Sequence, residues 1–171
     1  MRQDNMDIFI LRHGDANSDS KKITDDSKRS LTDIGIKEIE NVSKFFMEFD
    51  IDINQIFSSP LRRAKQTSEI ILKSQKKAKL TEVVELKPEG KPEEVCKKII
   101  KQNNNTILLV GHNPLLINII SYITNSQEQT MSGFSLKTGG LAKIKTTTFE
   151  PRIHGHLEWL LTPKLIRKVS K

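Results

Sequence analysis

A small set of histidines and arginines in this sequence has the side chains that chemistry on a phosphoryl group needs. Arginine binds phosphate oxygens through a planar fork of N–H donors. A neutral imidazole can attack phosphorus and form a covalent intermediate, and a second, protonated imidazole can donate to an oxygen on which charge develops. The set consists of Arg12 and His13, the adjacent pair Arg62 and Arg63, and His112.

Each member of this set follows a segment that the sequence predicts to be a buried strand. These apolar segments lie at 7–11, 53–57 and 106–110. In open α/β sheets, ligands bind at the carboxyl ends of the strands, so the three polar clusters are expected to share one cleft. Helices predicted to begin at Pro60, with Ser59 as N-cap, and at Pro114 would add partial positive charge there.

Strand and helix patterns alternate along the whole chain. This alternation predicts an α/β protein, a three-layer α/β/α sandwich with a mostly parallel central sheet. Because no repeat or linker divides the sequence, we expect a single domain over 1–171. Further expected elements are a polar loop at 17–30, a helix capped by Thr32 with apolar positions Ile36, Ile39, Val42 and Phe46, a helix at 92–101, and strands at 81–86, 141–144 and 157–161.

Composition and charge limit the classes of partner. The formal net charge of +7 favours anionic partners, but the basic residues are dispersed and few aromatic residues lie among them, so nucleic-acid binding is not favoured. A single cysteine, Cys96, rules out an internal disulfide and is typical of a reducing compartment. There is no secretory signal and no apolar run of roughly 20 residues, so we expect a cytoplasmic protein with no membrane partner.

Three sequence motifs give the chain a specific resemblance to a known family. LRHGDA at 11–16, SPLRRAKQT at 59–67 and GHNP at 111–114 occur in the order typical of the histidine phosphatase superfamily, which has the phosphoglycerate mutase-like fold. Runs at 29–35 and 139–142, with WLLTP near the C-terminus, resemble the SixA-type branch, the phosphohistidine phosphatases.

This resemblance implies a role for each matched residue and requires no metal or other cofactor. It makes His13 the nucleophile and His112 the second imidazole, and it selects Arg63 rather than Arg62 as the arginine that binds phosphate. The predicted catalytic residues are His13, His112, Arg12 and Arg63, and the predicted substrate-binding residues are Arg12, Arg63, His112, Gly14 and Asn113.

Two features of the sequence favour phosphohistidine as the substrate. His112 follows Arg63 by only 49 positions (112 − 63), whereas larger relatives that act on metabolites usually have a long insertion there. Many relatives also carry an acidic residue after the second histidine, where this chain has Asn113. An imidazole leaves with less help from an acid than an alkoxide does. Glu82 and Glu85 are the nearest candidates for such an acid, and the sequence leaves their role open.

The sequence therefore predicts a phosphatase that hydrolyses phosphohistidine on a protein or peptide through a phosphohistidine intermediate. Two alternatives stay open: a general phosphomonoesterase acting on sugar phosphates or nucleotides, and a non-catalytic module that binds phosphorylated partners. His154 and His156 are interpreted as surface histidines of a hairpin rather than metal ligands, because no third ligand is evident. The oligomeric state is not predicted.

Overall fold

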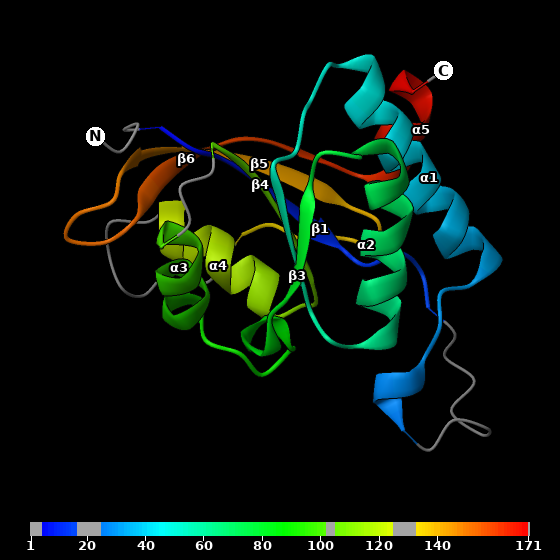
Figure 1. The fold of residues 1–171 in the computed structure, drawn as a ribbon, viewed down its shortest axis with the longest axis horizontal. Coiled ribbons are helices and arrows are strands. Elements are labelled where there is room, and N and C mark those ends of the chain that lie inside the picture. The colour runs from blue at the N-terminus through cyan, green and yellow to red at the C-terminus, as the bar shows by residue number, and fades with distance from the viewer. Residues whose placement is uncertain (1–4, 17–24, 102–104, 125–132, 171) are drawn as a thin grey trace.

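A computed structural model describes residues 5–16, 25–101, 105–124 and 133–170 of the chain. The described part is built on one six-stranded sheet in the order β3-β2-β4-β1-β5-β6 (Figure 1). The first four of these strands are parallel, and β5 and β6 are antiparallel to their neighbours. The strands are β1 (Asp7–Arg12), β2 (Gln55–Ser58), β3 (Lys79–Glu82), β4 (Thr106–Gly111), β5 (Leu141–Thr148) and β6 (His154–Leu161).

Helices cover both faces of this sheet (Figure 1). One face packs against α1 (Asp33–Glu48), α2 (Arg62–Ser74) and α5 (Pro163–Val169), and the other against α3 (Pro92–Ile100) and α4 (Leu115–Thr124). Because successive strand residues point to opposite faces, Phe9 and Leu11 of β1 belong to the first core, whereas Ile8 and Ile10 belong to the second. The predicted three-layer α/β/α sandwich with a mostly parallel sheet is confirmed. Within the described ranges, no helix has the length and apolar character needed to cross a bilayer.

The predicted start of α1 is confirmed in detail. The Thr32 hydroxyl accepts a hydrogen bond from the Gly35 amide at 3.0 Å, which satisfies one of the unpaired donors of the first turn. Ile39, Val42 and Phe46 are buried as expected. Ile36 is not, since its side chain is 36% exposed and the helix instead turns Phe45 toward the sheet.

The predicted start of α2 is wrong by two residues. The helix begins at Arg62 with Leu61 in the N-cap position, and no side chain caps it. Ser59 does not serve as the cap because its hydroxyl lies 2.9 Å from a ring nitrogen of His112. The cap residue expected from the sequence therefore belongs to the polar cluster at the end of the sheet.

Several other boundaries differ from the sequence-based expectation. The strand expected at 81–86 is divided into β3 and a short 3-10 helix, η2 (Val84–Leu86), and both C-terminal strands are longer than predicted. Helix α5 is not predicted at all. Within the loop expected at 17–30, residues 17–24 lie outside the described part, and Asp26–Lys28 form a second 3-10 helix, η1.

The strand register brings the three polar clusters to one edge of the sheet. Arg12 at the end of β1 pairs with Gly111 at the end of β4, and Ser58 at the end of β2 pairs with Val110. Beyond these pairs, the His13 amide donates to the Gly111 carbonyl at 3.2 Å. The residues that follow the three strands therefore lie together at the carboxyl edge, as the topology predicts.

Candidate active site

His13 is held in one orientation by its immediate neighbours. Its Nδ1 lies 2.7 Å from the Gly14 carbonyl oxygen, which can only accept, so Nδ1 carries the proton. Its Nε2 consequently has a free electron pair, and Arg63 Nε donates to that atom at 3.2 Å. The side chain is 6% exposed. A histidine held in this way has its nucleophilic nitrogen directed at the arginine that would bind the phosphoryl group.

The surroundings of His13 favour its neutral form. Burial, together with the positive charges of Arg63, Arg12 and Arg29, lowers the pKa of His13 to about 4, against the opposing effect of the hydrogen bond to Gly14. At neutral pH the ring is therefore uncharged, which is the form that can attack phosphorus.

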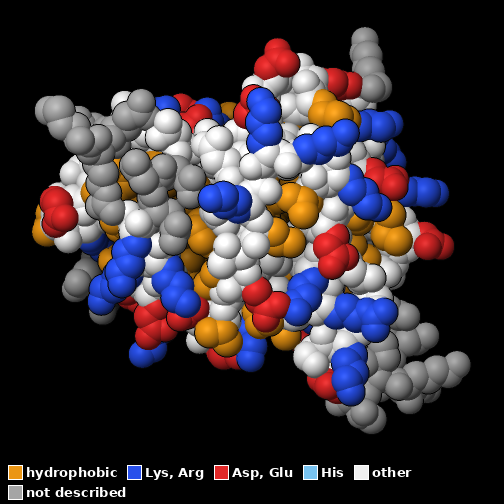
Figure 2. Space-filling model, in the orientation of Figure 1, with side chains coloured by type: hydrophobic (Ala, Val, Ile, Leu, Met, Phe, Trp, Pro, Cys, Tyr) orange, Lys and Arg blue, Asp and Glu red, His pale blue; other side chains and the backbone are white. Residues whose placement is uncertain are grey.

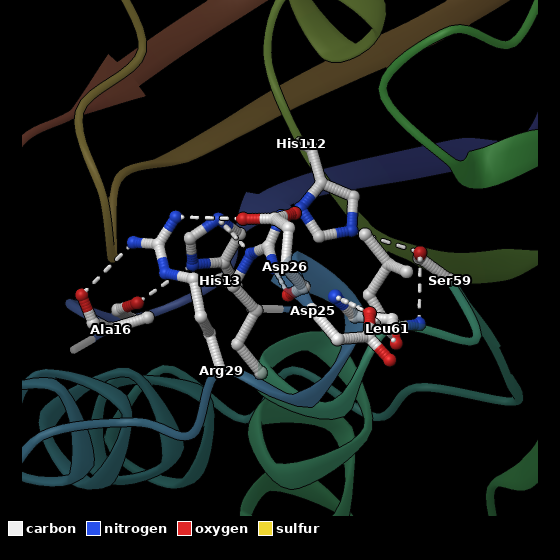
Figure 3. A network of polar contacts seen from close by, with 11 residues as sticks. His13, Ala16, Asp25, Asp26, Arg29, Ser59, Leu61 and His112 are labelled. Atoms are coloured by element: carbon white, nitrogen blue, oxygen red, sulfur yellow. Dashed lines mark hydrogen bonds and ion pairs between the residues drawn. The ribbon is translucent and has the colours of Figure 1, made fainter. Parts of the chain in front are cut away.

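His112 lies directly beside His13, with ring centroids 4.9 Å apart (Figure 3). Its Nε2 is 2.9 Å from the Ser59 hydroxyl, while its Nδ1 is buried with no hydrogen-bond partner among the described residues. Burial, followed by the neighbouring His13 and Arg63, lowers the pKa of His112 to about 3. His112 is thus neutral at neutral pH, and an incoming phosphoryl dianion would favour its protonation.

The two arginines also face the same region. Arg12 donates from Nη1 to the Leu136 carbonyl at 3.0 Å, and its buried Nε has no partner in the described part of the chain. Burial and then the charge of Arg63 lower the pKa of Arg12. Two guanidinium groups whose charges repel each other are stabilised by an anion that binds both. Arg62, in contrast, is exposed, as expected.

Gly14 and Asn113 form hydrogen bonds with protein groups that hold His13 and Arg12 in place. Gly14 contributes the carbonyl that orients His13, and its amide donates to the Thr67 hydroxyl at 3.3 Å. The Asn113 side chain donates to the Leu136 carbonyl at 2.9 Å, the same oxygen that accepts from Arg12. Asn113 therefore shares with Arg12 the oxygen that holds its guanidinium in place.

An acidic residue that sequence reasoning missed occupies the outer side of Arg63. The backbone oxygen of Asp26 in η1 accepts from Arg63 Nη1 at 2.9 Å, and its carboxylate accepts from Arg63 Nη2 at 3.0 Å and from Arg29 Nη1 at 2.9 Å (Figure 3). Partial burial alone would raise the pKa of Asp26, but hydrogen bonds from Arg29 and the charge and hydrogen bond of Arg63 outweigh it, so the pKa is lowered. Asp26 is an ionised carboxylate at neutral pH.

The two glutamates considered as possible acids pair with lysines instead. Glu82 Oε2 lies 2.5 Å from the Lys65 ammonium group of α2, and Glu85 Oε2 lies 2.7 Å from that of Lys98 in α3. Among the described residues, both glutamates are in ion pairs with these lysines and not with the arginines of the site. Nothing in this geometry makes either residue a proton donor.

The remaining residues singled out by sequence have structural roles. Cys96 is buried in the core under α3, and burial raises the pKa of its thiol to about 12, so it is not a nucleophile. His154 and His156 lie on β6 of the β5–β6 hairpin, as expected. Within the described residues, no group of three or more potential ligands is arranged to hold a metal ion.

Comparison with known proteins agrees with this architecture. Residues 8–89 match the model of the histidine phosphatase superfamily (branch 1). The chain is 26% identical to the phosphohistidine phosphatase SixA of Escherichia coli (strain K12) over 162 residues, which are 92% of this chain and 94% of that protein.

Solved structures show the same fold. The protein histidine phosphatase SixA complexed with tungstate superposes with a TM-score of 0.77 at 24% identity, over 94% of this chain and 99% of that chain. The alpha-ribazole phosphatase from Shigella flexneri superposes with a TM-score of 0.69 at 15% identity, over 89% of this chain and 95% of that chain. With its three motifs converging at the carboxyl edge of the sheet, this chain matches the histidine phosphatase superfamily over residues 8–89 and resembles its SixA-type branch.

Proposed function

We propose that this chain, acting as one domain over 1–171, hydrolyses phosphohistidine on a protein or peptide in two steps. The feature that carries the proposal is the His13 ring, which is neutral, has an unprotonated Nε2 directed at Arg63, and has its centroid 4.9 Å from that of the His112 ring. The single buried cysteine is compatible with a cytoplasmic location, which we also propose.

In the first step, His13 Nε2 attacks phosphorus while Arg12, Arg63 and His112 bind the phosphoryl oxygens. The bond from phosphorus to the substrate imidazole breaks, and that imidazole leaves with the electron pair. Because the buried donors Arg12 Nε and His112 Nδ1 have no partners among the described residues, they are available for those oxygens. Electrostatic stabilisation by prepositioned donors is the main demand of phosphoryl transfer.

In the second step, water attacks phosphorus and phosphate leaves His13. Nδ1 of His13 stays protonated and donates to the Gly14 carbonyl throughout, so the ring of phospho-His13 is a cationic imidazolium and a good leaving group. Asn113 is assigned as a positioning residue, because it and Arg12 donate to the same carbonyl oxygen.

The state of the nearby carboxylate supports phosphohistidine over a phosphate ester. Asp26 is ionised and bonded to two arginines, so it cannot protonate an alkoxide leaving group. A substrate imidazole that is protonated on its other ring nitrogen leaves as a neutral ring and needs no proton from this carboxylate. The phosphomonoesterase alternative is retained because the same fold occurs in the alpha-ribazole phosphatase, which is not named a phosphohistidine phosphatase.

The test is to trap the intermediate and compare substrates. Purified protein mixed with a phosphohistidine peptide should give an acid-labile, alkali-stable phosphoenzyme, and His13→Ala should abolish both the phosphoenzyme and turnover. The kcat/KM for the phosphohistidine peptide should exceed that for a phosphoserine peptide or a sugar phosphate by about two orders of magnitude. Faster hydrolysis of the esters would favour the general phosphomonoesterase, and turnover retained in His13→Ala would refute the catalytic assignment.

The proposed chemistry also predicts that chelators of metal ions leave the phosphatase activity unchanged. Two arginines and His112 provide the positive charge and donors that a metal ion provides in other phosphatases. Turnover of the phosphohistidine peptide should be unchanged after dialysis against EDTA, measured with and without added Mg²⁺. A loss that Mg²⁺ restores would contradict a metal-independent mechanism.

A further inference from the structure

A groove of about 1000 Å³ lies beside the active site, between α1, the segment 137–138 and the start of α5. We call it the basic groove, because its charged lining is predominantly cationic. In Figure 2, lysine and arginine side chains are prominent on the side of the molecule where Figure 1 places α1 and α5. The cations that line the groove are Lys37, Lys44, Lys137, Lys164 and Arg167, and its carboxylates are Glu38 and Glu40.

The positive charge of the basic groove is not neutralised from within the described part of the chain. None of its five cations has a carboxylate of a described residue within ion-pair distance. Glu38 is directed away from them, since its Oε2 accepts from the Asp15 amide at 3.0 Å. Glu40 is left as the exposed carboxylate among five cations. The groove therefore presents a local excess of positive charge to solvent.

The basic groove shares a wall with the catalytic cleft. The Leu136 carbonyl accepts from Arg12 on the cleft side, and Lys137, the next residue, lines the groove. The Gly139 amide donates to the carbonyls of both Arg12 and His13, at 3.1 and 3.0 Å. A chain lying in the groove would thus run next to the strand end that carries the nucleophile.

We propose that the basic groove binds an acidic segment of the phosphoprotein substrate; this rests on the proposed function. Charge complementarity of this kind steers encounter and fixes register. The lining favours a protein over a nucleic acid, because the described residues that form it include no aromatic side chain on which a base could stack. It does include apolar surface from Ile34, which is 66% exposed, and from Pro163, suited to the side chains of a peptide.

The first test measures binding without catalysis. Full-length His13→Ala protein is titrated with two unphosphorylated peptides that differ only in having glutamate or glutamine in their flanking segment. We expect the glutamate peptide to bind about tenfold more tightly at low salt, with the difference shrinking as ionic strength rises. Lys44→Glu combined with Arg167→Glu should remove the difference, whereas Lys76→Glu combined with Lys77→Glu, between α2 and β3, should keep it.

The second test separates docking from chemistry. In otherwise wild-type protein, Lys44→Glu with Arg167→Glu should raise the KM of a phosphohistidine peptide with a glutamate flank about tenfold. It should leave unchanged the KM of the glutamine-flanked peptide and the KM of phosphoramidate, a substrate too small to reach the groove.

The outcomes separate this proposal from the proposed function. Equal effects of the two charge-reversed pairs would refute groove binding, as would stronger competition by a single-stranded oligonucleotide than by the glutamate peptide. Absence of phosphoramidate and phosphohistidine turnover in the unaltered protein would refute the proposed function instead, whatever the peptides bind.

Discussion

At the scale of single residues, the least expected feature is a carboxylate on the arginine proposed to bind phosphate. Asp26 Oδ2 lies 3.0 Å from Arg63 Nη2, so it makes the kind of contact that a phosphoryl oxygen would make. The Arg63 side chain is 6% exposed, while that of Asp26 is 59% exposed. The carboxylate can therefore be displaced into solvent at modest cost, and it competes with phosphate for the same guanidinium.

Asp26→Asn should consequently strengthen phosphate binding. The substitution removes the partly exposed ion pairs of Asp26 with Arg29 and Arg63. Phosphate then no longer competes with this carboxylate, and its binding should gain about 1 kcal/mol, or roughly fivefold in affinity. The Ki of inorganic phosphate and the KM of the phosphohistidine peptide should both fall by that factor, as measured by steady-state kinetics at fixed ionic strength.

Asp25→Asn is the matched control. The Asp25 carboxylate accepts hydrogen bonds from Ser27 and pairs with Lys28 rather than with Arg63, and asparagine can still cap η1. If Asp26→Asn instead reduced kcat with unchanged KM, the carboxylate would be part of the chemistry rather than a competitor.

The sequence predicts both histidines of the candidate site, but it does not predict the Asp26 carboxylate that lies near them. His13 and His112 follow strand ends, and a motif marks each one. Asp26 is missed because its partner Arg63 is 37 positions away and η1 has no apolar periodicity to mark it. The run at 29–35, which resembles the SixA-type branch, is the sequence signal available for this segment.

At the scale of elements, the first turn of α1 supports the loop that carries His13 at very short range. A Cβ atom on Gly35 would lie 2.0 Å from the Asp15 carbonyl oxygen, and one on Gly14 would lie 2.6 Å from the Gly35 carbonyl oxygen. Thr32 joins the same contact, since its hydroxyl donates to the Asp15 carboxylate at 2.7 Å. The helix and the loop that carries His13 can approach this closely only because both positions are glycine.

Gly35→Ala should therefore reduce activity although alanine is normally the better helix former. The added methyl group must displace the backbone at Asp15, two residues from His13, and a displacement of about 1 Å at a reacting group can lower the rate about a hundredfold. We expect kcat to fall by about that factor and the free energy of unfolding to fall by about 1–3 kcal/mol, measured by urea denaturation.

Gly133→Ala provides the comparison, because a Cβ there meets nothing within 4 Å. That variant should change the free energy of unfolding by less than about 0.5 kcal/mol and leave kcat unchanged. Equal behaviour of the two variants would show that the helix does not constrain the loop.

Element boundaries show where local sequence signals stop being sufficient. Thr32 caps α1 as its residue type predicts, but Ser59, an equally good cap in the sequence, lies against His112 instead. Helix α5 is missed because its seven residues contain little periodic apolar pattern, and its buried Ile166 packs on a core formed by distant segments. In both cases a long-range contact overrides or replaces the local signal.

At the scale of the whole molecule, the sheet topology determines which distant residues meet. Parallel β1, β2 and β4 end at the same edge, so histidines 99 positions apart (112 − 13) have neighbouring rings. Alternation of strand and helix is enough to predict this convergence from sequence. The burial it causes cannot be predicted in the same way, since the exposure of both rings depends on how η1, the loop at 136–139 and α2 surround them.

That burial predicts a loss of stability as the pH falls. The pKa of His13 is lowered from 6.5 to about 4 and that of His112 to about 3, so both rings are neutral in the folded protein well below pH 6.5. The unfolded chain protonates these histidines near pH 6.5 and is thereby favoured. The contribution of the neutral rings is thus fully present above pH 6.5 and is lost as the pH falls toward the folded values.

Urea denaturation at several pH values between about 7 and 5 measures this loss. Each histidine should lower the free energy of unfolding by on the order of 1 kcal/mol per pH unit below pH 6.5. His112→Gln should reduce the slope, because one of the two buried groups no longer titrates, whereas His156→Gln, an exposed position on β6, should leave it unchanged. A slope that is the same in all three proteins would mean that the two rings are not held neutral by the fold, and the nucleophile would then need another source of its uncharged form.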